Sequence, residues 1–242
     1  MTPQELYRNG RLREAITALG DELRKNPLDA KRRTFLFELL LFAGEYDRAE
    51  KQLEVLAGAG ADAAAGTLLY RSALHAERTR QDMFAQNQTP PLEAREQTSG
   101  TCDGRPFGEF MDSDPRIGPN MEVYIAGSYT WIPIAYLRKV EIEAPVTLRD
   151  LMWARARIET TPEFRLQELG EVLIPAICPL SSRHPEEIVQ LGRETAWEED
   201  STYDAVPFGA KMMLVDGADV PLLSIRSVEW PPGPKESDDA AA

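Results

Sequence analysis

The sequence predicts a multidomain protein of α and β structure, in which a helical-repeat domain is followed by a strand-rich α+β domain. Two observations predict this fold class. Apolar residues recur at helical spacing in the first third of the chain, and after about residue 120 they alternate with polar residues. A polar segment rich in Asn, Gln, Pro and Gly separates the two patterns. We therefore predict a helical domain over residues 1–88, a linker over 89–106, a strand-rich domain over 107–230 and a disordered tail over 231–242.

Helix start and stop signals divide the first domain into five predicted helices. Thr2 and Glu5 form a capping box at the start of the first helix, and Gly10 follows its end. Asp29 caps the third helix, which is apolar on nearly every side except at Glu38. We therefore expect this third helix to lie between neighbouring helices.

A short motif recurs 34 residues apart in the second and fourth predicted helices. Each copy contains a glycine turn, a large apolar residue, a small residue and another apolar residue. The first copy is Gly10, Leu12, Ala15 and Leu19, and the second is Gly44, Tyr46, Ala49 and Leu53. The small residue lets two helices approach closely. Period and pattern match the second helix of a tetratricopeptide repeat, so we predict a tetratricopeptide-like domain. The alternative is an unrelated bundle of helical hairpins.

Alternating apolar residues predict strands in the second domain. Two such runs, residues 122–126 and 129–132, flank Gly127-Ser128, which predicts a hairpin with a type II′ turn. Further strands are expected around residues 140–142, 172–174 and 212–215, with a hairpin turn at Asp216-Gly217 and a capped helical turn over residues 147–150. All four tryptophans lie in this domain, where strand aromatics usually belong to the core.

The composition argues against several classes of partner. The net charge of −13 repels nucleic-acid phosphates and anionic membrane surfaces, so we expect neither as a partner, although an acidic surface attracts basic segments. The two cysteines are far apart in sequence and form no disulfide framework. The start of the chain lacks the features of a signal peptide, and the most apolar stretch, residues 35–42, is too short to span a bilayer. We therefore expect a cytoplasmic protein.

The segment over residues 109–116 is the best candidate for chemistry. In an extended chain Asp112 and Asp114 point the same way, as a divalent cation site or an acid–base pair would require. A metal-dependent hydrolase is therefore the alternative function, which metal analysis and titration would test. Two carboxylates are few for a metal site, and the simpler interpretation is that they cap turns and bind Arg116 or backbone amides. We assign no catalytic, cofactor-binding or metal-binding residue.

Five blocks, in order, resemble a known family. They cover residues 110–119, 122–133, 143–153, 192–197 and 221–226. The motif residues in these blocks are Asp112, Asp114, Arg116, Gly118, Trp131, Arg149, Asp150, Trp153, Arg193, Trp197 and Arg226. The chain is similar in these blocks to the ImpE/TagJ family, accessory proteins of bacterial type VI secretion systems. Residues 86–105 are shorter and more polar than the corresponding helical stretch of that family.

The resemblance implies a non-catalytic cytoplasmic adaptor that works beside the contractile sheath. It implies that a helix of the small sheath subunit is the partner, with a link to the AAA+ ATPase that recycles contracted sheath. The expected mode is a helix in a groove, in which apolar partner residues enter the groove while the acidic surface orients the helix. A general assembly scaffold or chaperone for the same machine is a further hypothesis that the sequence does not separate from this one.

Overall fold

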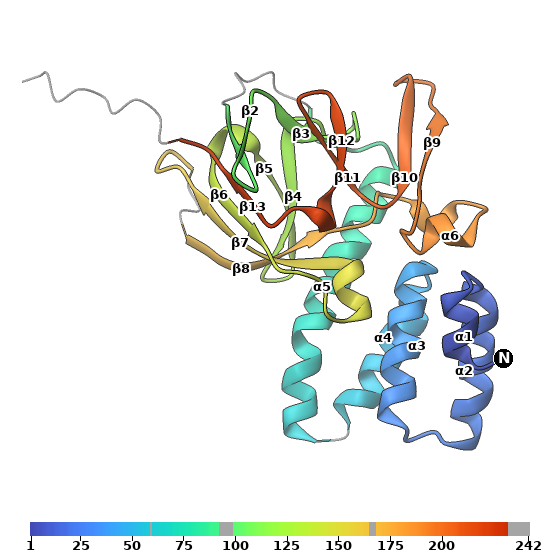
Figure 1. The fold of residues 1–242 in the computed structure, drawn as a ribbon. Helices are drawn as coiled ribbons and strands as arrows, with labels where there is room; N and C mark the ends of the chain where they lie inside the picture. The colour runs from blue at the N-terminus through green and yellow to red at the C-terminus, as the bar shows by residue number, and fades with distance from the viewer. Residues whose placement is uncertain (59, 92–98, 165–167, 232–242) are drawn as a thin grey trace, which may run out of the picture.

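The computed structural model describes residues 1–58, 60–91, 99–164 and 168–231. A row of helices at one end of the molecule adjoins a strand-rich part at the other (Figure 1). The predicted order, helices first and strands after them, is confirmed. The predicted tail lies outside the described residues from position 232 onward, as does the part of the predicted linker over residues 92–98.

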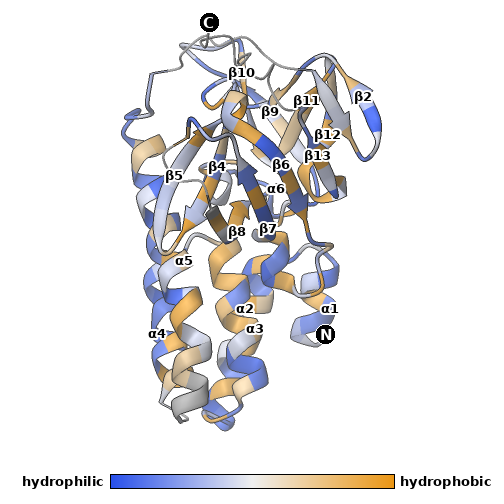
Figure 2. Cartoon of the chain, turned by 90° about the vertical axis from the view of Figure 1, so that its left-hand side faces the viewer, coloured by the Kyte–Doolittle hydropathy of each residue, from blue (hydrophilic) through white to orange (hydrophobic). Residues whose placement is uncertain are grey.

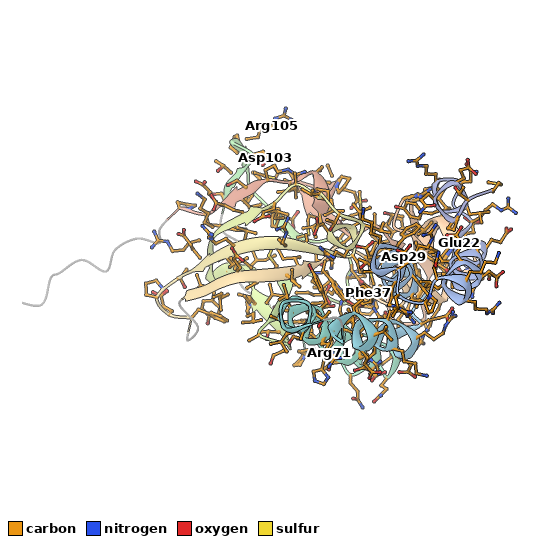
Figure 3. The ribbon with its side chains drawn as sticks, turned by 90° about the horizontal axis from the view of Figure 1, so that it is seen from below. Glu22, Asp29, Phe37, Arg71, Asp103 and Arg105 are labelled. Atoms are coloured by element: carbon orange, nitrogen blue, oxygen red, sulfur yellow. The ribbon has the colours of Figure 1, made fainter. Side chains whose placement is uncertain are left out.

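Each helix of the first part packs on the next in chain order. The helices are α1 (Pro3–Arg8), α2 (Leu12–Lys25), α3 (Ala30–Phe42), α4 (Tyr46–Ala57) and α5 (Ala61–Ala85). α3 lies between α2 and α4 (Figure 1), as expected of a helix with apolar residues on almost every side. Figure 2 colours the helices by hydropathy. Seen from below, Phe37 of α3 points into the interior of the helices, whereas Arg71 lies on the outer side of α5 (Figure 3).

The predicted caps and repeat positions have a regular structural role. The backbone N–H of Glu5 donates to the hydroxyl of Thr2, and the N–H of Arg32 donates to the carboxylate of Asp29. Gly10 and Gly44 adopt positive φ, +75° and +69°, at the ends of α1 and α3. The other repeat positions that we predicted to pack, Ala15, Leu19, Ala49 and Leu53, are buried. The tetratricopeptide assignment itself stays a prediction.

Glu38 is a carboxyl group buried in this helical core, where it is 8% exposed. Burial raises its pKa to about 7, although the guanidinium of Arg149, 3.7 Å away, favours the ionised form. A carboxyl whose pKa is higher in the folded chain contributes stability that is complete below its unfolded pKa and lost as the pH rises through its folded pKa. For Glu38 that window runs from pH 4.5 to about 7.

Replacing Glu38 with Gln should therefore raise the free energy of unfolding at pH 8 by about 1–3 kcal/mol and change it little at pH 4. Urea denaturation at both pH values measures this difference. Glu54→Gln, at an exposed position of α4, is the matched control and should show no such pH dependence. Equal behaviour of the two variants would contradict the assigned environment of Glu38.

The strand-rich part is built on an antiparallel sheet with the order β2-β1-β13-β6-β7-β8-β4-β5 among the described residues. Its strands are β1 (Gly100–Cys102), β2 (Arg105–Phe107), β4 (Asn120–Ile125), β5 (Ser128–Pro133), β6 (Leu137–Ile142), β7 (Trp153–Thr160), β8 (Glu168–Pro175) and β13 (Ser227–Glu229). Two smaller sheets adjoin it. One joins β3 (Phe110–Asp112), β11 (Met212–Val215) and β12 (Ala218–Pro221), and the other joins β9 (Thr195–Glu199) and β10 (Ala205–Gly209).

Short helical segments connect these strands. They are η1 (Ile134–Tyr136), η2 (Leu148–Leu151), η3 (Ser181–Arg183), α6 (Glu187–Gln190) and η4 (Leu222–Ser224). η2 is the predicted helical turn over residues 147–150, and the turn at Asp216-Gly217 joins β11 to β12 as predicted. None of the described helices is both long enough and apolar enough to cross a bilayer.

Two details of the strand-rich part differ from prediction. β1 and the first two residues of β2 lie within residues 89–106, which the sequence pattern assigns to a linker. Their Asp103-Gly104 turn has positive φ at both residues, and the Asp103 carboxylate accepts hydrogen bonds from the N–H groups of Arg226 and Ser227. The predicted II′ turn at Gly127-Ser128 is also wrong. The loop is Ala126-Gly127, both with positive φ, which is the type I′ turn that suits the strand twist.

The side chains of β4 point alternately to the interior of the strand-rich part and toward the helices. Met121 and Val123 point to the interior of the strand-rich part, whereas Glu122 and Tyr124 point toward α5. Tyr124 and Trp153 belong to the same apolar cluster as the side chains of α2, α3 and α4. The two predicted domains are therefore joined by a continuous core.

Candidate functional site

The aspartate segment that follows β3 is held by cations of the chain itself. Lys211 donates to the carboxylate of Asp112, and Arg116 donates to that of Asp114 through Nε at 2.8 Å and Nη2 at 2.6 Å. Asp112 also accepts the N–H of Asp114 at 2.9 Å, and the N–H of Gly118 (φ +52°) donates to the Asp114 carbonyl at 2.9 Å. Both aspartates thus accept backbone N–H groups of this turn, and Asp114 but not Asp112 binds Arg116.

The same geometry gives no support to the metal-dependent hydrolase. Asp112 is directed at Lys211 and Asp114 at Arg116, so that each carboxylate faces a positive charge rather than a shared cation position. No group of three His, Cys, Asp or Glu residues in the described ranges is arranged to hold a metal ion.

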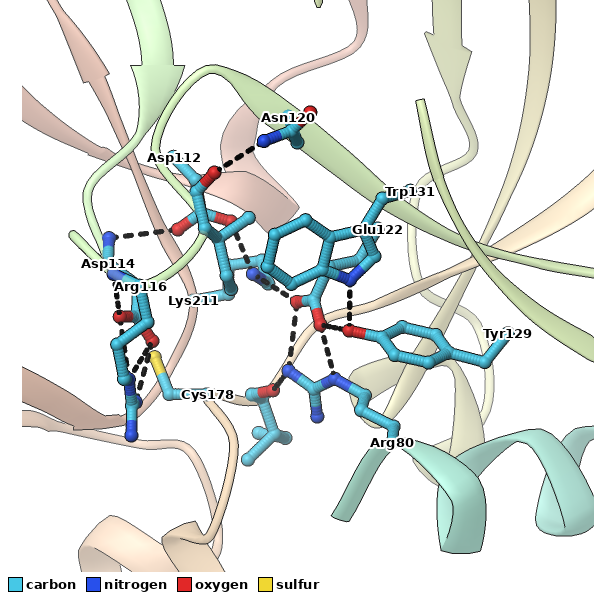
Figure 4. A network of polar contacts seen from close by, with 12 residues as sticks. Arg80, Asp112, Asp114, Arg116, Asn120, Glu122, Tyr129, Trp131, Cys178 and Lys211 are labelled. Atoms are coloured by element: carbon cyan, nitrogen blue, oxygen red, sulfur yellow. Dashed lines mark hydrogen bonds and ion pairs between the residues drawn. The ribbon is translucent and has the colours of Figure 1, made fainter. Parts of the chain in front are cut away.

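A buried ionic network connects this segment to α5. Arg80 of α5 donates to both carboxylate oxygens of Glu122, at 2.7 and 2.9 Å, and to the carbonyl of Ile177 at 3.0 Å. Lys211 lies between Glu122, at 2.7 Å, and Asp112 (Figure 4). The two cations and two carboxylates are almost fully buried, and the buried carboxylate of Glu77 lies 3.5 Å from Arg80 as well.

The pKa values of the two carboxyl groups shift in opposite directions. Burial alone would raise the pKa of Glu122, but Arg80 and Lys211 outweigh it and lower the pKa to about 2. For Asp112, burial raises the pKa more than its one cation, Lys211, lowers it. The pKa of the Asp112 carboxyl is therefore raised to about 6. Glu122 is therefore the ionised centre of the network.

Glu77, one helical turn before Arg80, makes a second set of contacts with the sheet. Its carboxylate accepts hydrogen bonds from the hydroxyl of Tyr124 and from Nε1 of Trp153, the latter at 3.0 Å. Gln81 donates to the other oxygen of Glu77 and accepts the N–H of Leu180 at 2.9 Å. The C-terminal half of α5 is thus bonded to three separate segments of the strand-rich part.

Several predicted motif residues hold the helices against the strand-rich part. Arg149 of η2 lies over the ring of Tyr70, 4.3 Å from its centroid. Asp150 accepts the N–H groups of residues 146 and 147, which fixes η2. Arg193 donates to the carbonyls of Tyr7 and Arg8 at 2.6 and 2.8 Å. Arg149 and Arg193 thus connect the helical part to the strand-rich part, and Asp150 fixes the turn that carries Arg149.

The remaining motif residues have different surroundings. Trp131 donates to the hydroxyl of Tyr129, and Arg226 donates to backbone carbonyls of η4 and its neighbour. Trp153 is 2% exposed, whereas Trp197 on β9 is 44% exposed. The expectation that tryptophans lie in the core therefore fails at Trp197, because β9 belongs to a two-stranded sheet and its residues are half-buried or exposed.

A groove of about 700 Å³ lies where the N-terminal half of α5 runs past the outer face of β6, β7 and β8. Leu68 and Leu69, 65% and 55% exposed, stand on its helical wall. The sheet wall is lined by charged side chains and by the partly buried Leu173. These charged residues are Glu141, Glu143, Arg155, Arg157 and Glu171. The groove is therefore apolar on one side and charged on the other.

Sequence reasoning missed both the network and the groove. Glu77 and Arg80 lie at helical spacing with the buried Ala73 and Phe84, so charged residues on an apolar stripe were the available signal for the network. The groove has no comparable signal, because its walls come from segments about 50 to 110 residues apart along the chain.

Comparisons with known proteins give the chain its family. The family model of the ImpE protein matches residues 104–229. The type VI secretion system accessory component TagJ of Pseudomonas aeruginosa is 31% identical over 268 residues, covering 96% of this chain and 92% of that protein. The crystal structure of VPA1032 from Vibrio parahaemolyticus shares the fold, with a TM-score of 0.83 and 22% identity over 95% of this chain and 97% of that one. The chain belongs to the ImpE/TagJ family of type VI secretion accessory proteins.

Proposed function

We propose that this accessory protein is a non-catalytic cytoplasmic adaptor that binds a helix of the small contractile-sheath subunit. It would assist sheath assembly or the recycling of contracted sheath by the AAA+ ATPase, which is the second proposed partner. The observation that carries the proposal is the similarity to TagJ along almost the whole chain. It is supported by a solvent-open groove with exposed leucines, a feature suited to protein docking.

The arrangement of the buried charges also favours an adaptor over an enzyme. Enzyme acids and bases have to reach a substrate, whereas Asp112 and Glu122 are buried and bound to Lys211 and Arg80. The acidic chain, with a net charge of −13, favours a partner segment with basic side chains.

Titration of the full-length protein with a peptide from the amino-terminal helical segment of the small sheath subunit tests the proposal. Calorimetry should give a dissociation constant in the micromolar range or tighter, roughly 8 kcal/mol of binding free energy. A peptide of the same composition in scrambled order is the control. If circular dichroism shows folded protein and no heat of binding is detected, the sheath helix is not the partner.

A further inference from the structure

We propose that the groove between α5 and the outer face of β6–β8 is the docking site for an amphipathic partner helix with one aliphatic face and a basic flank. This inference rests on the proposed function and adds to it the location and the chemistry of the contact. Most of the residues that line this groove lie outside the five sequence blocks, and the exceptions are Tyr124, Ala126, Gly127 and Glu143.

Leu68 and Leu69 supply the aliphatic contact. Consecutive leucines that are both more than half exposed are unusual on a helix whose other face is packed on α4. Ala65, which is exposed, borders them on the same wall and its small side chain leaves space for partner side chains, whereas Ala73 at the other end of the wall is buried. The wall from Ala65 to Ala73 is about 12 Å long, which corresponds to roughly two helical turns.

The sheet wall favours a helical occupant over an extended one. β7 is hydrogen-bonded to β6 on one side and to β8 on the other, and β8 is also bonded to β4. Among the described residues β7 therefore has no free edge in the groove, so an extended peptide cannot pair with this central strand there. The β4–β5 turn borders the groove beside α5, where a Cβ on Gly127 would come within 3.2 Å of Ser72.

The charges of the sheet wall favour a basic flank on the partner. Arg155 pairs with Glu143 at 3.2 Å and Arg157 with Glu171 at 3.8 Å. Glu141 pairs instead with Lys139, which does not line the groove. The lining thus carries three carboxylates and two guanidinium groups within an acidic chain, so the local and the overall charge both attract basic side chains.

Peptide titration of full-length variants tests this assignment, with the sheath-subunit peptide as the probe. Leu68→Glu and Leu69→Glu should each weaken binding by about tenfold or more, because a carboxylate replaces an apolar contact. Val55→Glu, at an exposed aliphatic position of α4 outside the groove, should bind within about twofold of wild type. Glu171→Lys should weaken binding more than Glu199→Lys, which changes the net charge equally on β9.

The outcomes separate the groove from the function. If the Leu68→Glu and Leu69→Glu variants bind the peptide as tightly as the wild type does, the groove is not the docking site. The proposed adaptor function is then unaffected. Absence of wild-type binding overturns both the proposed function and this occupant. Self-association of the wild type in sedimentation that Leu68→Glu abolishes would assign the groove to a second copy of the chain and likewise overturn the inference.

Discussion

Replacing Arg80 with Met is expected to lower the free energy of unfolding by about 3–5 kcal/mol, because removal of one partner leaves a buried charge without compensation. Arg80 is bidentate to Glu122 and also satisfies the carbonyl of Ile177. Methionine fills similar space and supplies none of these donors. Lys211 remains near Glu122 but is shared with Asp112.

Urea denaturation at neutral pH measures the effect of Arg80→Met. Arg78→Met is the matched control on the same helix, because Arg78 forms ion pairs with the exposed carboxylates of Asp47 and Glu50, and should cost no more than about 1 kcal/mol. The double variant Arg80→Met with Glu122→Met should recover part of the loss, since it removes the uncompensated carboxylate as well. Similar losses for Arg78→Met and Arg80→Met would contradict the buried network.

Replacing Trp153 with Ala should cost about 3–5 kcal/mol, the usual penalty for deleting a large aromatic side chain from a core. Trp153 packs edge-on against Tyr124, donates to the carboxylate of Glu77, and belongs to the core shared by the helices and the sheet. Its loss therefore creates a cavity and leaves Glu77 short of a donor. Hydrogen exchange should accelerate most in the C-terminal half of α5.

Trp197→Ala provides the comparison for Trp153→Ala. The chemical change is the same, but Trp197 is 44% exposed on β9, so the loss should be about 1 kcal/mol or less. Denaturation curves of the two variants are compared under the same conditions. Equal losses in the free energy of unfolding would show that the contribution of Trp153 to stability does not depend on its burial.

Local signals predicted much of the helical part. The capping box at Thr2, the cap at Asp29, the glycines after α1 and α3 and the helical spacing of apolar residues all depend on residues a few positions apart. The structure confirms the helices that they indicate. The aspartate segment was equally accessible, because Asp114 and Arg116 are two residues apart and bond directly.

Local sequence signals could not predict contacts between segments that are distant along the chain. β1 and β2 have three residues each, too few for an alternating pattern, and β1 pairs with β13 more than 120 residues away. The position of Lys211 beside Asp112 likewise depends on the pairing of β3 with β11. Periodicity reports which face of an element is buried and carries no information about which element covers it.

α5 passes without interruption from the helical part into the strand-rich part. Its N-terminal half forms a wall of the groove, and its C-terminal half carries Glu77, Arg80 and Phe84 against the sheet. Residues 67–85 contain neither glycine nor proline, the usual sites of a helical kink. A force applied at Leu68 would therefore be transmitted along an unkinked helix to the ion pair between Arg80 and Glu122. The helical part and the strand-rich part would then move together under that force.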